Sequence, residues 1–191
     1  YLDIYYLHRE DHNTPLHVTV SAIGDLIRQG KIRYWGLSNY RGWRIAEVIR
    51  IADSLGIDRP VISQPLYNIV NRQAETEQIT AAQNYGLGVV PFSPLARGVL
   101  SGKYDPDSPP PRDSRAASES MGHFMDRLMQ PDVLRAVQRL KPVAEEAGLT
   151  LPQFALAWVL REPNVASAII GASRPEQVRE NAKASGVTLS A

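Results

Sequence analysis

Residues 30–40, GKIRYWGLSNY, run from a glycine through a short apolar and aromatic stretch into the polar pair Ser38-Asn39. A run of this length, closed by turn-forming residues, predicts a strand over residues 32–37. In parallel α/β folds, the loops that follow the carboxyl ends of the strands provide the functional groups. Ser38 and Asn39 are therefore candidates for a functional site.

Four further strands are expected, at residues 2–7, 61–64, 88–92 and 166–170. Polar or aromatic side chains stand at the end of each one, as Ser38 does. Taken singly, each has an ordinary explanation, because serine and asparagine cap helices and phenylalanine packs in cores. Their common position favours a shared site, and the residues concerned are His8, Gln64, Phe92, Ser93, Gly171 and Ser173.

Amphipathic helical patterns separate the strands. The first lies between Thr14-Pro15 and Gln29-Gly30, and Thr150 is a predicted N-cap. Residues 93–130 are long, polar and proline-rich, which is typical of a functional loop. The remaining helices are expected at residues 43–55, 75–85, 131–147, 151–161 and 175–185.

This alternation of strands and helices predicts parallel βαβ units. Five such strands fit an open doubly wound sheet or part of a (β/α)8 barrel, which needs eight strands. A strand-linked G-x-G-x-x-G is absent, which weakens a Rossmann interpretation. The pattern alone leaves both architectures open.

The composition of the chain excludes several classes of function. The 191 residues include 21 Lys and Arg against 20 Asp and Glu, a net charge of +1, with no basic run that would indicate nucleic acid. No apolar stretch is long enough to span a bilayer, and no signal-peptide pattern is present. Cysteine is absent, which excludes disulfides and thiolate chemistry. A cytoplasmic globular protein without a nucleic-acid or membrane partner is expected.

Several long segments together resemble the aldo-keto reductases, most closely the branch with bacterial members and potassium-channel β-subunits. The segments are LDIYYLHRED, GKIRYWGLSNY, SQPLYNIVNR, VVPFSPLARGVLSGKY and IIGASRPEQVREN. The resemblance implies a (β/α)8 TIM barrel, of which residues 1–191 would be the second half, strands four to eight. Residues 93–130 would form its long cofactor and substrate loop.

The resemblance implies a nicotinamide site at the first four strand ends. His8 takes the place of a catalytic histidine that orients or polarises the substrate carbonyl. Ser38, Asn39 and Gln64 match a clamp for the nicotinamide carboxamide, whose donor and acceptor suit amide side chains. Phe92 matches an aromatic that stacks on the ring. Without the resemblance, His8 would be read as a surface residue and Phe92 as core.

The resemblance also implies the rest of an NADP(H) site. Ser93, Leu95 and Arg97 match the pyrophosphate loop, and Lys103 and Arg115 match basic residues that meet the phosphates. For Arg115, an ordinary solvated charge is a serious alternative. Arg174 or Arg179 would pair with a 2′-phosphate. The residues assigned to the final strand-to-helix turn and the adenine are Gly171, Ser173, Gln177, Glu180 and Asn181.

The family reaction also needs an aspartate, a tyrosine and a lysine, which lie in the first half of the barrel. We expect them before Tyr1, in the same chain or a complementing fragment. The implied function is NADP(H)-dependent reduction of a small aldehyde or ketone, with no metal. Two alternatives remain: an NADP(H)-binding regulatory subunit of the channel β-subunit type, and an inactive truncated fragment.

Overall fold

The computed structural model describes residues 1–120 and 122–189 and divides the chain into two compact units. The first, the sheet unit, comprises residues 1–67, 72–92 and 163–167. The second, the helical unit, comprises residues 68–71, 93–162 and those from 168 onward. No helix among the described residues is both long and apolar enough to cross a membrane.

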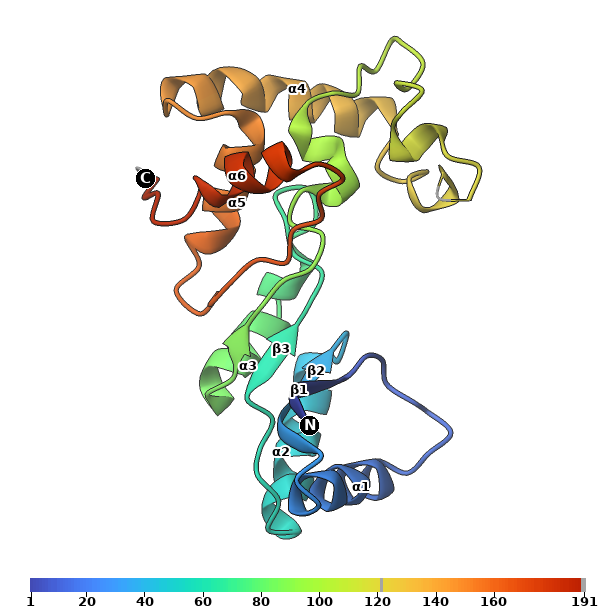
Figure 1. The fold of residues 1–191 in the computed structure, drawn as a ribbon, viewed down its shortest axis with the longest axis vertical. Helices are drawn as coiled ribbons and strands as arrows, with labels where there is room; N and C mark the ends of the chain where they lie inside the picture. The colour runs from blue at the N-terminus through green and yellow to red at the C-terminus, as the bar shows by residue number, and fades with distance from the viewer. Residues whose placement is uncertain (121, 190–191) are drawn as a thin grey trace. The chain divides into compact units, whose positions relative to one another are not determined.

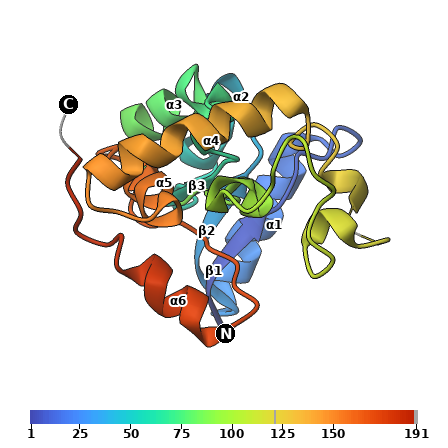
Figure 2. The ribbon, with the colours of Figure 1, turned by 90° about the horizontal axis from the view of Figure 1, so that it is seen from above.

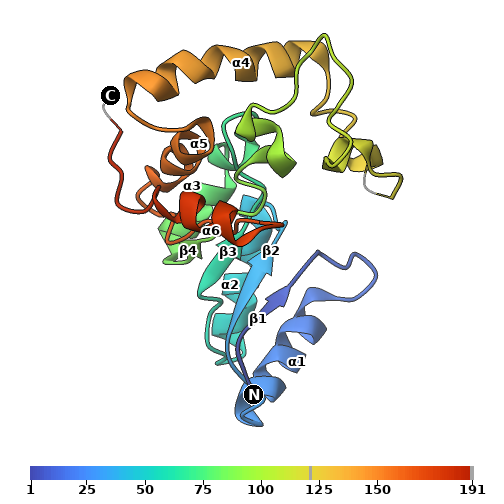
Figure 3. The same ribbon diagram turned by 45° about the horizontal axis from the view of Figure 1, so that its top comes forward.

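The sheet unit is built on four parallel strands in the order in which they occur along the chain. Adjacent strands pair in register, with Tyr6 opposite Gly36 and Ser38 opposite Gln64. The predicted parallel arrangement is thereby confirmed. The strands, visible in Figures 1 and 3, are β1 (Leu2–Leu7), β2 (Ile32–Ser38), β3 (Ile62–Gln64) and β4 (Gly88–Val89).

The prediction of a strand at residues 166–170 is wrong, because the described part of the chain has four strands, none of them there. Val89 and Val165 form a single parallel bridge, and the Ala166 N–H donates to the Val89 carbonyl at 2.9 Å. Since β4 is itself only two residues long, it offers no longer edge on which a ladder could form.

Helices cover one face of this sheet. Trp35 and Leu37 of β2 are fully buried, and α1 contacts both β2 and α2. The Trp35 indole N–H also donates to the Asp58 carbonyl at 2.7 Å. The helices of the sheet unit are α1 (Leu16–Arg28), α2 (Gly42–Ser54) and α3 (Gln78–Tyr85), with the short 3-10 helix η1 (Gln73–Glu75) before α3.

The opposite face of β1 and β2 has exposed apolar side chains. Successive residues of a strand point to opposite faces, so Tyr34 and Gly36 lie opposite to Trp35. Tyr34 is 55% exposed, and its register partner Ile4 is 40% exposed. Two layers, one sheet and one set of helices, therefore form the described part of this unit.

The helical unit has its own apolar core. Within it, α4 (Pro131–Glu146) lies beside α5 (Leu151–Leu160), as Figure 2 shows, and α6 (Pro175–Ala182) contacts α5. The loop of residues 93–130 contains η2 (Ala96–Ser101), η3 (Arg115–Ala117) and η4 (Gly122–Phe124). The buried core consists of Ala96, Val99, Leu100, Tyr104, Met125, Leu134, Val137, Ala144, Leu151 and Ala155.

The predicted cap at Thr150 is confirmed. Its Oγ1 accepts the Gln153 backbone N–H at 3.4 Å, and the Gln153 Oε1 accepts the Thr150 N–H at 3.1 Å. This reciprocal arrangement satisfies two N–H groups that the start of α5 would otherwise leave without partners. It fixes where α5 begins, and therefore the position of Gln153.

Candidate functional site

Three of the predicted residues lie in one row across the sheet unit. Leu7 pairs with Leu37, so the next residues, His8 and Ser38, stand side by side at the ends of β1 and β2. Ser38 in turn pairs with Gln64 at the end of β3. The parallel register therefore brings the three strand-end side chains to one edge of the sheet, as their common position in the sequence predicts.

Hydrogen bonds connect this row. The Asn39 Nδ2 donates to the His8 carbonyl at 3.0 Å and to the Ser38 Oγ at 3.0 Å. The Ser38 hydroxyl donates to the Gln64 carbonyl at 2.9 Å. An amide nitrogen has only two hydrogens, so an Asn39 amide held in this way offers its Oδ1 to a ligand. We call His8, Ser38, Asn39 and Gln64 the strand-end cluster.

Asn39 adopts an unusual backbone conformation, with φ of 62°. Asparagine tolerates this left-handed region better than most residues other than glycine. The conformation turns the chain immediately after β2, where the Asn39 side chain reaches back to His8. Ser38 is 1% exposed, whereas the Asn39 and His8 side chains are exposed. Asn39 and His8 are therefore the members of the cluster most open to a ligand.

Phe92 also belongs to the sheet unit. Its backbone N–H donates to the Pro65 carbonyl at 3.0 Å, and it forms a parallel bridge with Leu66. These contacts hold Phe92 next to the segment that follows Gln64. The ring is partly buried, which leaves part of it to stack against a ligand.

In the helical unit, the predicted pyrophosphate loop is a turn of unusual backbone geometry. Ser93, Ala96 and Arg97 have φ of 54°, 46° and 57°, and Gly98 follows with 97°. Non-glycine residues persist in this region only where their surroundings hold them, and such residues are concentrated at functional sites. Successive backbone N–H groups in turns of this kind can form a concave anion site.

Asn68, which the motifs alone do not select, holds this turn. Its Nδ2 donates to the Ser93 carbonyl at 2.9 Å, and its Oδ1 accepts the Val70 N–H at 3.1 Å. The Ser93 carbonyl also accepts the Ala96 N–H at 2.9 Å. Asn68 is 2% exposed. Its position just beyond the strand that ends at Gln64 is the sequence signal that could have identified it.

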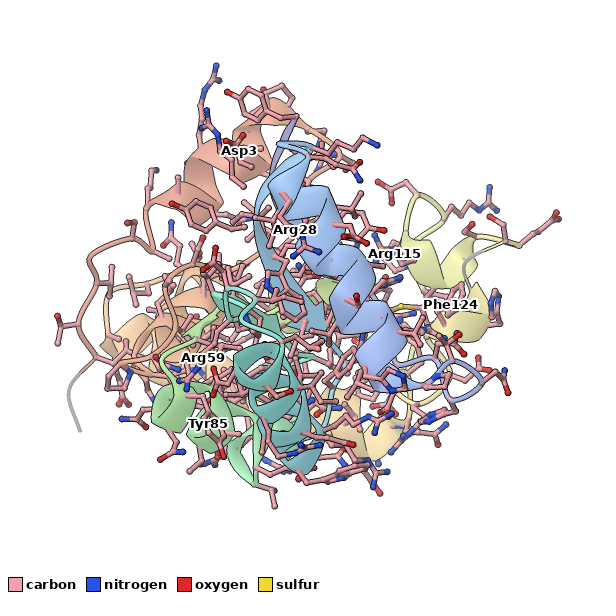
Figure 4. The ribbon with its side chains drawn as sticks, turned by 90° about the horizontal axis from the view of Figure 1, so that it is seen from below. Asp3, Arg28, Arg59, Tyr85, Arg115 and Phe124 are labelled. Carbon is pink, nitrogen blue, oxygen red and sulfur yellow. The ribbon has the colours of Figure 1, made fainter. Side chains whose placement is uncertain are left out.

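The basic residues of the loop differ in their surroundings. Arg97 donates to the Phe124 carbonyl at 3.1 Å, with its guanidinium 4.9 Å from the centre of the Phe124 ring. The Lys103 ammonium lies close to Gly98, since a Cβ built on Gly98 would be 3.8 Å from the Lys103 Nζ. Arg115 is exposed on η3, which contacts the η4 segment of Phe124 (Figure 4). Leu95 packs against the core of the unit.

The turn before α6 lines a shallow hollow that is open to solvent. The Gln177 Oε1 accepts the Ser173 N–H at 2.8 Å and the Ser173 hydroxyl at 3.2 Å. Gly171 immediately precedes the hollow, and a Cβ built on it would meet no other atom within 4 Å. The lining residues, two of them arginines, are Ala172, Ser173, Arg174, Pro175, Val178 and Arg179.

Glu180 and Asn181 have structural contacts. The Glu180 carboxylate accepts from Lys183 at 2.7 Å and from the Gln153 Nε2 at 3.4 Å. The same Gln153 Nε2 donates to the Glu180 carbonyl at 3.1 Å. Asn181 is only 8% exposed. Both residues therefore help to hold α6, whereas Gln177 lies at its start beside the hollow.

The predicted catalytic and cofactor residues thus fall into two groups. His8, Ser38, Asn39, Gln64 and Phe92 belong to the sheet unit, and the others belong to the helical unit. Within the part of the chain that the structure describes, no three His, Asp or Glu side chains are grouped to hold a metal ion.

Comparison with known proteins identifies relatives over the whole chain. The model of the Aldo/keto reductase family matches residues 1–191. The chain is 44% identical over 185 residues to a probable voltage-gated potassium channel subunit beta of Arabidopsis thaliana, an alignment covering 96% of this chain and 56% of that protein. It is 36% identical over 187 residues to L-glyceraldehyde 3-phosphate reductase of Escherichia coli strain K12, covering 96% and 53%. The chain spans about half the length of these curated relatives.

Proposed function

This chain belongs to the aldo/keto reductase family, and on that premise we propose that the protein reduces aldehydes or ketones to alcohols with NADP(H). The family fold is a (β/α)8 barrel, and the parallel sheet with its helices is consistent with part of one. Since the chain spans about half the length of its relatives, the proposal concerns the whole protein. We also propose that the whole protein is cytoplasmic.

The observation on which the proposal depends is the strand-end cluster. Four predicted residues from three strands are joined by hydrogen bonds of 2.9 to 3.0 Å. A nicotinamide carboxamide has one carbonyl acceptor and two N–H donors. The Asn39 Oδ1 and the Gln64 side chain are the matching groups, so the residues present fit this ligand. Fixing the carboxamide would orient one face of the ring toward the substrate.

Two features of the helical unit support NADP(H) as the cofactor. Arg174 and Arg179 line the hollow before α6, and a guanidinium can form paired hydrogen bonds with a phosphate. The hollow lies at the N-terminus of α6, where the helix dipole favours an anion. The Ser93 to Gly98 turn, with Lys103 beside it, would hold the pyrophosphate.

His8 would orient the substrate carbonyl. Its side chain is exposed at the end of β1, and its backbone carbonyl is held by Asn39. When bound, the cofactor would supply the hydride. The proton would come from a tyrosine assisted by a lysine and an aspartate, which we place outside residues 1–191. His8 would then hold the small carbonyl substrate between these groups.

The uncovered face of the sheet supports additional barrel strands. Leu2 is 55% exposed, Ile4 40% and Tyr34 55%. Because exposed edges and apolar faces of this kind invite pairing, we propose that further βα units cover them, in the same chain or in a complementing fragment.

Steady-state oxidation of NADPH by the intact protein with 4-nitrobenzaldehyde tests the proposal. We expect turnover that His8→Ala lowers by at least an order of magnitude. The matched control is His17→Ala, because His17 is an exposed histidine on α1. Equal losses of turnover in the two variants would count against the role of His8 in a reductase. No turnover with any carbonyl would count against a reductase.

A second candidate is an NADP(H)-binding regulatory subunit. It is favoured by the 44% identity to the protein named a probable voltage-gated potassium channel subunit beta. The two candidates share the cofactor site. Tight NADPH binding with negligible turnover across many aldehydes and ketones would select the regulatory subunit. Rapid turnover would select the reductase.

A further inference from the structure

The backbone around Lys103 is held by a side chain of α4. Gln138, in the middle of that helix, donates through its Nε2 to the Gly102 carbonyl at 3.3 Å and to the Tyr104 carbonyl at 2.6 Å. An amide nitrogen has two hydrogens, so both are used here. The two carbonyls flank a single residue, Lys103. One side chain, 34 and 36 residues further along the chain, therefore holds the backbone on both sides of Lys103.

The glycine before Lys103 gives these hydrogen bonds their importance. Gly102 ends η2 with φ of 73°. Glycine populates positive and negative φ about equally, so its own preference does not fix the direction in which the chain leaves η2. A larger residue would collide with its neighbours, because a Cβ built on Gly102 would lie 2.8 Å from the Lys141 Cε and 3.0 Å from the Leu151 Cδ2. The direction of Lys103 therefore depends on hydrogen bonds, and those from Gln138 lie on either side of it.

Lys103 is directed back toward the turn that precedes it. Its Nζ lies 3.8 Å from a Cβ built on Gly98 and 5.2 Å from the centre of the Tyr104 ring. The Lys103 side chain is otherwise exposed. A long, flexible side chain of this kind loses conformational entropy when it binds an anion. A backbone that is fixed beforehand on both sides reduces the total entropy lost on binding.

We propose that Gln138 is a positioning residue, which holds Lys103 beside the Ser93 to Gly98 turn so that the ammonium meets the pyrophosphate of the cofactor. The proposal rests on the NADP(H) site proposed above and adds to it a residue that the family motifs do not select. Both amide hydrogens of Gln138 are engaged with the backbone. Gln138 therefore acts through Lys103 and does not itself donate to the phosphate.

The chain offers a matched pair of variants. Gln138→Met keeps the length of the side chain and removes its two donors. Gln83→Met makes the same chemical change at an exposed glutamine on α3, in the sheet unit. A second variant, Gln138→Asn, keeps the amide and withdraws it by one methylene. All three are made in the intact protein, and thermal unfolding first shows that they fold.

The first readout does not involve the cofactor. Reductive methylation with ¹³C-formaldehyde labels the lysines, and the NMR signal that is absent from Lys103→Met belongs to Lys103. Because the ammonium lies 5.2 Å from the centre of the Tyr104 ring, the chemical shift of this signal reports its position relative to the ring. Gln138→Met and Gln138→Asn are expected to shift the signal, and Gln83→Met is expected to leave it in place. A signal that does not respond to Gln138→Met would overturn the link between Gln138 and Lys103.

The second readout is the binding of NADPH and of adenosine 2′-monophosphate, which has no pyrophosphate. Gln138→Met is expected to weaken the binding of NADPH by about two- to tenfold, the effect of one hydrogen bond, and to leave that of adenosine 2′-monophosphate unchanged. Gln83→Met should change neither. Equal weakening of both ligands by Gln138→Met, or none, would overturn the role of Gln138 while the cofactor site stands.

A double-mutant cycle separates positioning from a general structural role. Lys103→Met alone should weaken NADPH binding at least as much as Gln138→Met does. If Gln138 acts through Lys103, adding Gln138→Met to Lys103→Met should cause no further loss of affinity. Additive losses would overturn the proposal, because Gln138 would then act independently of Lys103. A wild type that binds neither ligand would instead overturn the cofactor site and, with it, the purpose assigned to Gln138.

Discussion

The Asn39 amide nitrogen lies 3.0 Å from the backbone carbonyl oxygen of His8, 31 residues earlier in the chain. This bond ties the loop after β2 to the loop after β1. The position of His8 therefore depends on a side chain from another strand, and Asn39 has a structural role in addition to the ligand-binding role proposed for it.

Two substitutions of Asn39 distinguish the contribution of its side chain from that of its backbone conformation. Asn39→Gly and Asn39→Ala both remove the tether to His8, and we expect both to lower turnover to a similar extent. Only alanine places a Cβ at φ of 62°, so Asn39→Ala should be less stable than Asn39→Gly by about 1 kcal/mol. Urea denaturation and steady-state kinetics measure the two effects. Equal stability of the variants would show that the left-handed backbone is not strained.

Ser38→Ala tests the hydrogen bonds within the strand-end cluster. Ser38 is 1% exposed, and its loss leaves the Gln64 carbonyl without its hydroxyl donor. We expect a loss of about 1–3 kcal/mol in the free energy of unfolding. Ser54→Ala is the control, because Ser54 donates to the Ile51 carbonyl at 2.8 Å from an exposed position on α2. Its effect should stay within about 0.5 kcal/mol. A larger loss of stability in Ser54→Ala than in Ser38→Ala would contradict a buried hydrogen-bond network at Ser38.

Asn68→Ala should loosen the turn that begins at Ser93. The lost bond is the 2.9 Å contact between the Asn68 Nδ2 and the Ser93 carbonyl. Amide hydrogen exchange of residues 93–98, followed by mass spectrometry, should become faster, and NADPH should bind more weakly. Asn164→Ala removes a comparable 3.0 Å bond to the Leu87 carbonyl in the sheet unit. Faster exchange at residues 93–98 in that control would indicate general destabilisation instead.

Tyr40 makes the free energy of unfolding depend on pH in the alkaline range. Burial, and then the nearby Glu10 carboxylate, raise the pKa of its hydroxyl above 10.0. The folded state thus retains the phenol proton at a pH where the unfolded state loses it. The contribution to stability is complete below about pH 10 and falls as pH rises through the folded-state pKa.

Tyr40→Phe tests this dependence, because it should flatten the alkaline decline of the free energy of unfolding. Tyr34→Phe, at a residue 55% exposed, should leave the decline unchanged. Denaturant titrations on either side of pH ~10 provide the measurement. If the free energy of unfolding of Tyr40→Phe falls with alkaline pH as steeply as that of the wild type, the decline is due to other groups.

Much of the fold could be predicted because its signals are local. The strand that ends at Ser38, the cap at Thr150 and the parallel order of strands all depend on neighbouring residues and hydrophobic period. The strand expected at residues 166–170 is replaced in the structure by an isolated bridge at Val165, because a strand there depends on a partner, β4, of only two residues. That partner's length is not visible in the pattern of residues 166–170.

The sequence by itself determined the succession of strands and helices, the polar residues at the strand ends and the family to which they point. Only the tertiary structure decided which of those residues touch. Asn39 bonds the His8 carbonyl, and Asn68 bonds the Ser93 carbonyl. The physical reason is that register between strands and the packing of loops depend on the free energy of the whole fold. That free energy brings residues that are far apart in the chain into contact, and no local sequence pattern indicates such a contact.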